Sequence, residues 1–421
     1  MRCRLVAFVW ICAVLTVAST GMADGVILNG LAPRSIGRGG TNIAFADNGA
    51  VLFDNPAGAV NVRGQGLMDL GVDGIITQFR YSDPDNPSVS DTRIVPLPQI
   101  GYVRKSADER WAYGLGVFAP AGFSERFVME GPPPLDGRRP YNTFGALAKV
   151  LPGAAYRVTD RLSVGATLGV GISHVELEGP YFLQGPSPLA GLPTMLDIRG
   201  TGAALVWSFG LQYALTEATT VGATYQSESR FHLDGVANVD VTGLGLGRSS
   251  YKARTDITWP ESVGLGVRHE LCPHRILSAD VIWYNWSQAF DQLGIHLTEP
   301  SAVGFVPIYE EFPLRWHDTV SVRLGYERIL AGGRTIRFGY VYHRNSIPKE
   351  TLTPYIQAIL EHGFSAGYGW AYREWNIDLA YMFLFGPQQN VETSAIIGGD
   401  FSDSVHNAQA HALSISLMRQ F

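Results

Sequence analysis

Residues 162–173 read LSVGATLGVGIS, in which every second residue is Leu, Val, Ala or Ile and those between are Ser, Gly or Thr. Successive side chains of an extended strand point to opposite faces, so this segment has one larger apolar face and one small or polar face. The same pattern recurs at 204–214 and 375–385. It is typical of a strand that crosses a membrane as part of a β-barrel.

About fourteen segments with this period follow one another to the C-terminus, an even number as bacterial barrels require. They lie near 66–81, 94–105, 110–123, 142–157, 161–178, 199–214, 218–236, 250–270, 275–297, 315–329, 335–346, 362–372, 374–386 and 407–421. Short and long connections alternate between them, as expected for periplasmic turns and outer loops. Unpaired backbone groups are costly in hydrocarbon, so strands can span only as a closed sheet. We therefore predict an all-β, transmembrane antiparallel barrel of about 14 strands over residues 65–421.

Other fold classes fit less well. A soluble sandwich also alternates, but its large side chains would point inward, and the small faces here lack the bulk to fill a core. An α/β protein would place helical periods between the strands. Beyond the first 23 residues no apolar run approaches about 18 residues, which excludes a helical membrane protein.

The first 23 residues have the pattern of a cleaved secretory signal. Arg2 and Arg4 precede an apolar run from Leu5 to Ala18, and Gly21-Met22-Ala23 supplies small residues before a cut. The mature chain is expected to begin near Asp24. The protein is thus predicted to be exported, and with a barrel fold this indicates the bacterial outer membrane.

Several motifs resemble catalytic or ligand sites but lack the required context. Gly363-Phe364-Ser365-Ala366-Gly367 matches the nucleophile elbow of hydrolases, yet strand alternation continues through it. Gly37-Arg38-Gly39-Gly40 lacks the Lys-Ser/Thr of a phosphate loop. His269, Cys272 and His274 lack a fourth zinc ligand. A net charge of −6 argues against nucleic acid. We predict no enzyme activity, no cofactor and no metal site.

Two expected loops, 179–198 and 301–314, are unusually apolar. Exposed apolar patches often mark interaction sites, so we hypothesise an outer groove that captures hydrophobic molecules. The alternative is that these side chains pack into the barrel mouth. The groove candidates are Tyr181, Phe182, Leu183, Leu189, Leu192, Phe305 and Ile308.

Within the barrel, Pro120 and Gly122 fall in the third strand. Proline removes a ladder hydrogen bond and glycine permits a bend, so a kink or gap is expected there, unless the strand simply ends. Alternation places Arg268 and Arg323 on inward faces. Either could bind a ligand carboxylate or pair with a barrel carboxylate such as Asp280.

The segment from Ser35 to Gly58, SIGRGGTNIAFADNGAVLFDNPAG, is rich in glycine and shows little alternation. It closely resembles the hatch of the long-chain fatty-acid and aromatic-hydrocarbon outer-membrane transporters. The resemblance extends along the mature chain through Pro120-x-Gly122, Trp259-Pro260-Glu261-Ser262, Asp280, Trp283, Trp286-Ser287, Trp316-x-Asp318 and Arg323-x-Gly325.

This resemblance implies a fourteen-stranded barrel plugged by a hatch at residues 24–64. The hatch residues singled out are Gly37, Gly39, Gly40, Asn55, Pro56, Ala57 and Gly58, of which Asn55 to Gly58 would hold the hatch in place. It further implies passive uptake of a fatty acid or aromatic hydrocarbon by groove capture, lumenal binding and sideways exit at the kinked third strand. The inward arginines slightly favour the acid.

Three alternatives stay open at this point: a general diffusion porin, a barrel lipase using Ser365, and an adhesin or scaffold. The partners expected are the hydrophobic ligand, outer-membrane lipid and lipopolysaccharide, and the barrel-assembly machinery, whose recognition signal the terminal Phe421 resembles. The protein is expected to be a monomer.

Overall fold

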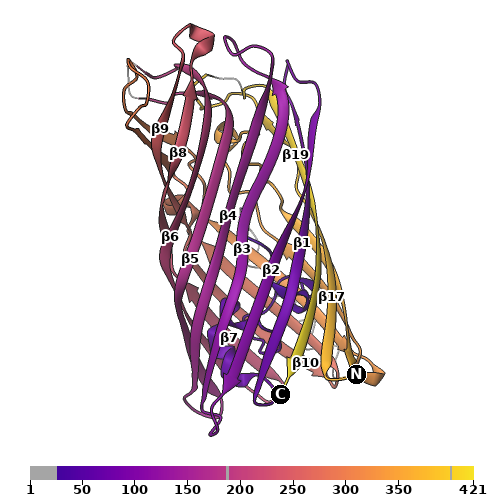
Figure 1. Cartoon of the computed structure of the whole chain (residues 1–421). Coiled ribbons are helices and arrows are strands. Elements are labelled where there is room, and N and C mark those ends of the chain that lie inside the picture. The colour runs from indigo at the N-terminus through magenta and orange to yellow at the C-terminus, as the bar shows by residue number, and fades with distance from the viewer. Residues whose placement is uncertain (1–25, 186–188, 399–400) are drawn as a thin grey trace.

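The structure is a computed structural model that describes residues 26–185, 189–398 and 401–421. Within these ranges nineteen strand segments form one sheet, which closes into a tall barrel (Figure 1). The signal sequence predicted at 1–23 lies outside the described residues.

Nine segments each form a whole span of the wall. They are β1 (Gly66–Ser82), β2 (Val89–Lys105), β3 (Trp111–Glu130), β4 (Arg138–Arg157), β5 (Leu162–Phe182), β6 (Pro193–Ala214), β15 (Thr335–Tyr342), β16 (His362–Tyr372) and β19 (Ser404–Gln420). Each of the five remaining spans is divided into two segments that follow one another along the chain. They are β7 (Thr219–Gln226) and β8 (Ser229–Asp240), β9 (Arg248–Trp259) and β10 (Ser262–Cys272), β11 (Arg275–Tyr284) and β12 (Gln292–Thr298), β13 (Ile308–Pro313) and β14 (Thr319–Ile329), and β17 (Trp375–Phe385) and β18 (Gln389–Val391).

One segment from each span contributes to a closed ring of antiparallel pairs. The order is β1, β2, β3, β4, β5, β6, β7, β10, β11, β14, β15, β16, β17 and β19, with β19 pairing back onto β1. The predicted fourteen-stranded antiparallel barrel is therefore confirmed. Short turns lie at one end, here called the turn end, and long connections lie at the other, the loop end (Figure 1).

The two faces of β5 are arranged as the alternation predicts. Leu168 is 59% exposed, and Val170 and Ile172 are also exposed on the outside of the wall, whereas Thr167 and Ser173 are buried. The large apolar face is therefore the outer one, which is the reverse of a soluble sandwich and suits contact with lipid.

Four neighbouring spans are broken at about the same level. Residues 218–236, 250–270 and 275–297 were expected as single strands, and this was wrong. The strand expected at 315–329 is present as β14, but the loop expected before it, 298–314, contains the further strand β13. Pro260 cannot donate a ladder hydrogen bond, and the helix α4 (Trp286–Ala289) divides β11 from β12. Trp286 and Phe290 pack with Trp316, their rings 4.9 and 4.7 Å from its ring. These aromatic contacts occupy the level at which pairing stops.

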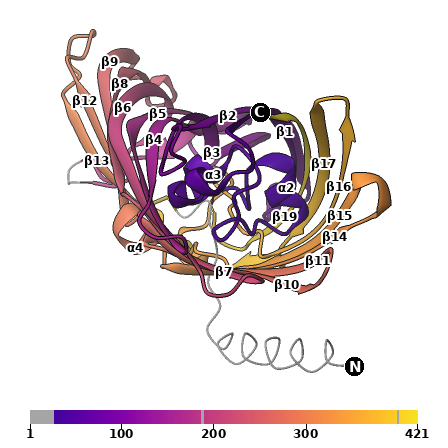
Figure 2. The same cartoon turned by 90° about the horizontal axis from the view of Figure 1, so that it is seen from below.

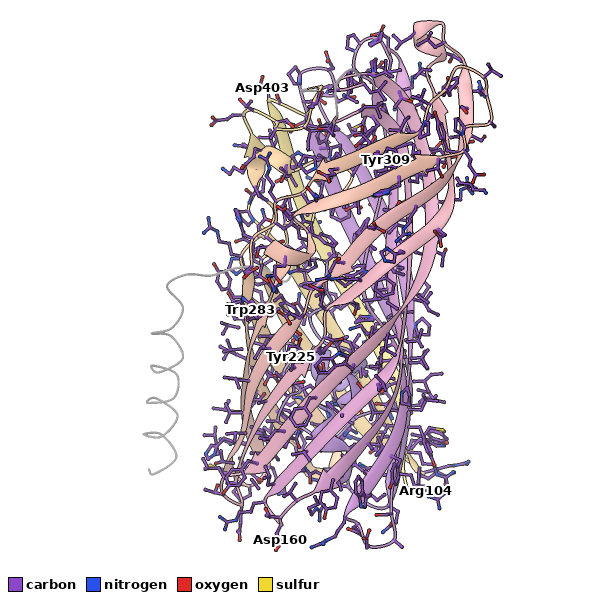
Figure 3. All side chains as sticks on the ribbon, turned by 90° about the vertical axis from the view of Figure 1, so that its left-hand side faces the viewer. Arg104, Asp160, Tyr225, Trp283, Tyr309 and Asp403 are labelled. Carbon is purple, nitrogen blue, oxygen red and sulfur yellow. The ribbon has the colours of Figure 1, made fainter. Side chains whose placement is uncertain are left out.

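Above these breaks the upper half of β6 pairs with β8, and β8, β9, β12 and β13 continue from it as a row of paired strands. In Figure 3, Tyr225 and Trp283 lie at mid-height, just before β7 and β11 end, and Tyr309 on β13 lies nearer the loop end. Figure 2 shows this row standing out from the ring on one side.

The N-terminal part of the described chain lies inside the ring (Figure 2). It contains α2 (Ala32–Gly37), α3 (Val51–Asp54) and the 3-10 helix η1 (Pro56–Asn61). Leu52 and Val60 of this segment are fully buried against the wall. The remaining 3-10 helices are η2 (Thr242–Leu244), η3 (Ala331–Gly333) and η4 (Lys349–Thr351). Over the described ranges, no helix combines the length and apolar character that crossing a membrane requires.

Candidate functional site

The third span is kinked at the predicted proline. Pairing between β3 and β4 shifts register between Phe118 and Ala121, so the chain around Pro120 bulges out of the ladder. Proline has no N–H to donate, which is why a bulge is tolerated there. In the described chain β2 and β3 are paired only between Ile100↔Val117 and Lys105↔Ala112. Towards the loop end the two strands separate, and the wall has a gap.

The first described residues close this gap from the inside. The Leu28 N–H donates to the Pro120 carbonyl at 2.9 Å, and the Gly122 N–H donates to the Val26 carbonyl at 3.1 Å. Ile27 thereby forms an antiparallel bridge with Ala121. Outside the gap, Ile94 on β2 is 72% exposed. The barrier between lumen and outer surface here is a short segment of hatch, held by two backbone hydrogen bonds.

Two of the cavities on the inner side of the wall lie between the loop end and the kink. The first, here called the mouth cavity, encloses about 900 Å³ out to its open edge. Most of its lining is apolar and comes from the loop-end half of the wall and from residues 347–356. Its main lining residues are Val175, Leu177, Ile257, Phe290, Leu293, Ile295, Phe312, Trp316, Ile347 and Tyr355.

The second, here called the kink cavity, lies behind the gap and comprises about 830 Å³ of space, including the open space at its edge. It is bounded by Val26 and Ile27 of the hatch and by Gly122 and Phe123 of β3. Phe123 also lines the mouth cavity, so the two spaces adjoin across its ring. Among the described residues that line either cavity, none is Lys or Arg.

The predicted hatch residues lie where the N-terminal segment touches the wall. The Asn55 amide donates to the Ile43 carbonyl at 2.8 Å and to the Leu211 carbonyl of β6 at 3.0 Å, while its oxygen accepts from the Ala57 N–H. A side chain at Gly165 would meet the Pro56 carbonyl carbon at 2.4 Å, and one at Gly58 would meet Val51 at 2.5 Å. At Gly165 the backbone of the wall therefore packs directly on the backbone of the hatch, whereas Gly58 makes room for the Val51 side chain within the hatch.

Gly37, Gly39 and Gly40 dock on the opposite side of the ring. The Gly39 N–H donates to the Ser365 hydroxyl at 3.0 Å. Ser365 is thus a buried acceptor for the hatch, on a strand and not on a strand-to-helix turn as a nucleophile elbow requires. Gly37 packs on Gly367 so closely that a methyl group on Gly37 would lie 3.0 Å from the Gly367 Cα.

Replacing Gly339 by alanine is expected to displace the hatch. A methyl group on Gly339 would lie 1.9 Å from the Gly39 nitrogen, a contact that can be relieved only by moving backbone. Limited proteolysis should then cleave the N-terminal segment at least tenfold faster than in the unaltered protein. Gly74→Ala is the control, because the nearest atom to its new methyl group is the Leu413 carbonyl oxygen at 3.8 Å. Equal cleavage of both variants would contradict this packing.

A ring of charges ties the hatch to the wall near the turn end. Arg34 donates to Asp378 at 2.7 Å, Asp378 accepts from Arg337 at 2.7 Å, and Arg337 donates to Glu327 at 2.6 Å. Arg38 then links Glu327, at 3.3 Å, to Asp47, at 2.7 Å. Arg34 lies 4.0 Å from Asp47 and completes the ring. Three arginines and three carboxylates alternate, half of them from the hatch and half from β14, β15 and β17.

The surroundings of Asp47 and Asp54 in the hatch shift the pKa values of these two residues in opposite directions. Burial opposes ionisation of Asp47, but Arg38 and Arg34 outweigh it and hold the pKa of Asp47 well below its usual range. Asp54 has no comparable ion pair among the described residues, and burial raises its pKa to about 7 despite a hydrogen bond from Asn42. At neutral pH the Asp47 carboxylate is therefore fixed as a charge, whereas Asp54 is close to its titration midpoint.

Neither of the two candidate lumenal arginines lines the mouth cavity or the kink cavity, although Arg323 lines a smaller pocket together with Ile27, Leu28 and Pro120. Arg323 on β14 donates to the Gly40 carbonyl at 3.3 Å and to the Tyr284 hydroxyl at 3.3 Å, and so helps to anchor the hatch. Arg268 on β10 lies with its guanidinium 5.8 Å from the Phe45 ring and lines an open pocket at the turn end. Neither position suggests a site for a carboxylate in the mouth or kink cavity.

The groove candidates come together at the loop end, but several are in strands. The loops predicted at 179–198 and 301–314 are shorter than expected, because β5 continues to Phe182 and β6 begins at Pro193, while Ile308 starts β13. Tyr181, Leu183 and Ile308 are buried in one cluster, against which Leu189, Leu192 and Phe305 pack. Phe182, also half-buried, pairs with Pro193 in the same hairpin. The cluster borders the mouth cavity through Tyr181.

Sequence reasoning missed residues 343–361 as part of the site. This connection folds into the barrel, where Tyr355 donates to the Pro180 carbonyl at 2.8 Å and the Gln357 N–H donates to Glu125 at 3.2 Å. Its apolar residues Tyr355, Ile356, Ala358, Ile359 and Leu360 were the available signal, because a loop so apolar is seldom left in solvent. Across the described ranges, no three His, Cys, Asp or Glu side chains are grouped so as to hold a metal ion.

Comparisons with known proteins agree with this architecture. The model of the family described as outer membrane protein transport protein (OMPP1/FadL/TodX) matches residues 14–421. The fold resembles that of a Pseudomonas aeruginosa FadL homologue, with a TM-score of 0.76 and 17% identity over 94% of this chain and 100% of that one. It also resembles the P. putida toluene transporter TodX, with a TM-score of 0.78 and 19% identity over 94% and 99%. The Ralstonia pickettii toluene transporter TbuX is similar with a TM-score of 0.70 and 19% identity, over 94% of this chain and 99% of that one. Among curated proteins, no sequence matches the chain.

Proposed function

Because the chain belongs to the outer membrane protein transport protein family (OMPP1/FadL/TodX), it is an outer-membrane transporter of hydrophobic substrates, and we propose that its substrate leaves sideways through the wall. The observation that carries the proposal is the gap between β2 and β3, closed in the described chain by the pairing of residues 26–28 with residues 120–122. Release would need only these two hydrogen bonds to open, while the ring below stays intact.

The proposed route begins at the loop end, which faces the cell exterior. The apolar cluster around Tyr181, Leu183 and Ile308 captures a hydrophobic molecule, which passes into the mouth cavity and across Phe123 into the kink cavity. Movement of the hatch then admits it to the gap, outside which Ile94 meets lipid. An apolar solute has a lower free energy in the membrane than in water, and this difference drives the transfer. No nucleotide or energised partner is therefore required.

The competing functions have less support. A diffusion porin needs an open, charged lumen, but the hatch backbone here packs against wall glycines on both sides of the ring. A barrel lipase needs a reactive serine, but Ser365 is buried and accepts a hydrogen bond from the hatch. We therefore propose a transporter without enzymatic activity. The toluene transporters among the similar structures support an aromatic hydrocarbon as one substrate class, with a fatty acid as the other.

Uptake by cells that lack their own transporter and express this chain tests the proposal. Labelled oleate and labelled toluene are supplied separately, and at least one is expected to enter saturably. Pro120→Ala combined with Gly122→Val should lower that rate at least tenfold, because the alanine restores an N–H and the new side chain at 122 would meet the Gly145 carbonyl oxygen at 2.8 Å. Free passage of small sugars, with saturable entry of neither substrate, would contradict the transporter and support a porin.

A further inference from the structure

The kink cavity contains polar atoms that no described residue satisfies. Asn29 Oδ1 of the hatch, Thr77 Oγ1 of β1 and Gln357 Nε2 of the 343–361 segment are buried and have no hydrogen-bond partner within the described chain. All three residues line this one cavity. Buried polar groups in proteins are almost always hydrogen-bonded, because leaving one unpaired costs free energy. Their concentration around one cavity indicates that a ligand supplies the missing partners.

The side-chain amides of Asn29 and Gln357 each use one atom in a contact with a histidine. The atom that remains is the one available to a ligand. The Asn29 amide nitrogen lies 3.1 Å from His343 Nε2, which leaves its oxygen as the acceptor. The Gln357 side-chain oxygen lies 3.2 Å from His406 Nδ1, which leaves its nitrogen as the donor. Gln357 is only 1% exposed, so this donor is well shielded from water. The cavity therefore presents an acceptor, a donor and a hydroxyl, together with Asp73 Oδ2, a further buried oxygen that has no partner among the described residues.

The charges around the cavity disfavour an anion. Asp73 and Glu125 both line it, and no Lys or Arg is among its described lining residues. Glu125 already accepts from Thr143 at 3.1 Å and from the Gln357 N–H at 3.2 Å, and Asp73 accepts from Gln99 at 3.0 Å. A bound carboxylate would find no cation and would lie near two acidic groups, which makes its transfer from water unfavourable. A neutral head group avoids that cost.

We propose that the kink cavity selects hydrophobic molecules that carry one uncharged hydroxyl, such as a phenol, over hydrocarbons and carboxylates. A hydroxyl can donate to Asn29 Oδ1 and accept from Gln357 Nε2, whereas a hydrocarbon can do neither. The apolar body packs on Phe123, Leu360 and Met382, which line the same space. This inference rests on the proposed function and names its substrate class.

Three aromatic molecules of matched shape test the selectivity: p-cresol, toluene and p-toluate. Initial transporter-dependent uptake is measured at equal low concentration in cells expressing the full chain, with vector-only cells subtracted. We expect p-cresol to exceed toluene about tenfold, the ratio for one hydrogen bond worth ~1.4 kcal/mol. Uptake of p-toluate should be at background. Equal rates for p-cresol and toluene, or faster entry of p-toluate, would overturn the inference.

Variants assign the selectivity to the cavity. Asn29→Leu with Gln357→Leu should lower the ratio of p-cresol to toluene uptake from about ten to about one, and a heat-modifiable band of the protein in isolated outer membranes reports that the barrel has folded. Thr77→Val, which keeps the side-chain shape, should also lower the p-cresol rate if the double variant does not assemble. Gln409→Leu is the control, because Gln409 bonds to Gln78 and is not among the lining residues. Unaltered p-cresol preference in the folded variants would overturn the assignment. Absence of all aromatic uptake, even in the unaltered protein, would instead reject the proposed transport.

Discussion

A disulfide joining positions 27 and 121 is expected to abolish uptake, and reduction is expected to restore it. Ile27 and Ala121 form an antiparallel bridge whose flanking hydrogen bonds join Leu28 to Pro120 and Gly122 to Val26. This arrangement makes 27 and 121 a non-hydrogen-bonded pair, with Cα atoms ~4.5 Å apart in regular sheets. A disulfide requires roughly that separation, so Ile27→Cys with Ala121→Cys should oxidise without moving the backbone.

The effect should be large because the pairing it fixes closes the gap next to Pro120, whereas the described contacts between β3 and the β2 side nearer the loop end, such as Arg126 N–H to Asp91, lie beyond it. In the oxidised variant the rate should fall at least tenfold, and a reductant should return it to within twofold of the unaltered protein. Each single cysteine variant, treated in the same way, is the control for the substitutions themselves. Full uptake by the oxidised double variant would mean that the substrate leaves by another path.

The second large effect is expected from Arg38→Met in the ring of charges. The Arg38 side chain is fully buried, bonds to Asp47 and Glu327, and stacks 3.5 Å from the Phe45 ring. Methionine has similar length but removes the cation between two carboxylates. Glu327 then keeps only Arg337, and Asp47 keeps only the longer 4.0 Å contact with Arg34. Removing one partner of a buried pair typically costs about 3–5 kcal/mol, and the remaining arginines should keep the loss near the lower value. The free energy lost should be that of docking the hatch in the barrel, because backbone pairing of the fourteen strands does not involve Arg38.

Hydrogen exchange measures that loss directly. Amides of α2 and α3 should exchange roughly 100- to 1,000-fold faster in Arg38→Met, since each ~1.4 kcal/mol corresponds to a factor of ten. Strand amides of the ring should be unaffected. Arg104→Met is the matched control, because Arg104 is exposed at the turn end (Figure 3). Adding Glu327→Met to Arg38→Met should cost less than the sum of the single changes if the two residues are coupled. Unchanged exchange in Arg38→Met would contradict the role given to the ring.

The parts of this structure that follow local rules could be predicted from the sequence. Alternation along residues 162–173 fixes which side chains face lipid, and Pro120 cannot take part in a regular ladder wherever it lies. The breaks in four spans could not be predicted in the same way. Residues 275–297 keep an apolar pattern, and only the packing of Trp286 against Trp316, 30 positions later, makes a turn of helix preferable to strand.

The site depends still more on contacts between distant residues. Arg34 and Asp378 are separated by 344 positions, and only the register of the closed ring brings them within 2.7 Å. Alternation correctly placed Arg323 on an inward face, but it cannot tell a lumenal cavity from the surface of a hatch. The same limit applies to Gln357, whose significance depends on which atoms around it stay unpaired.

The four aligned breaks also give the wall two tiers whose hydrogen-bond registers are independent. Below the breaks β7 pairs with β10 and β11 with β14, whereas above them β8 pairs with β9 and β12 with β13. In an unbroken strand, one inserted residue would turn every later side chain to the opposite face. Here an insertion above a break leaves the lower ring in register. Insertions can therefore lengthen and reshape the upper tier during evolution, and so change what the protein takes up, while the strand pairing of the lower ring in the membrane stays the same.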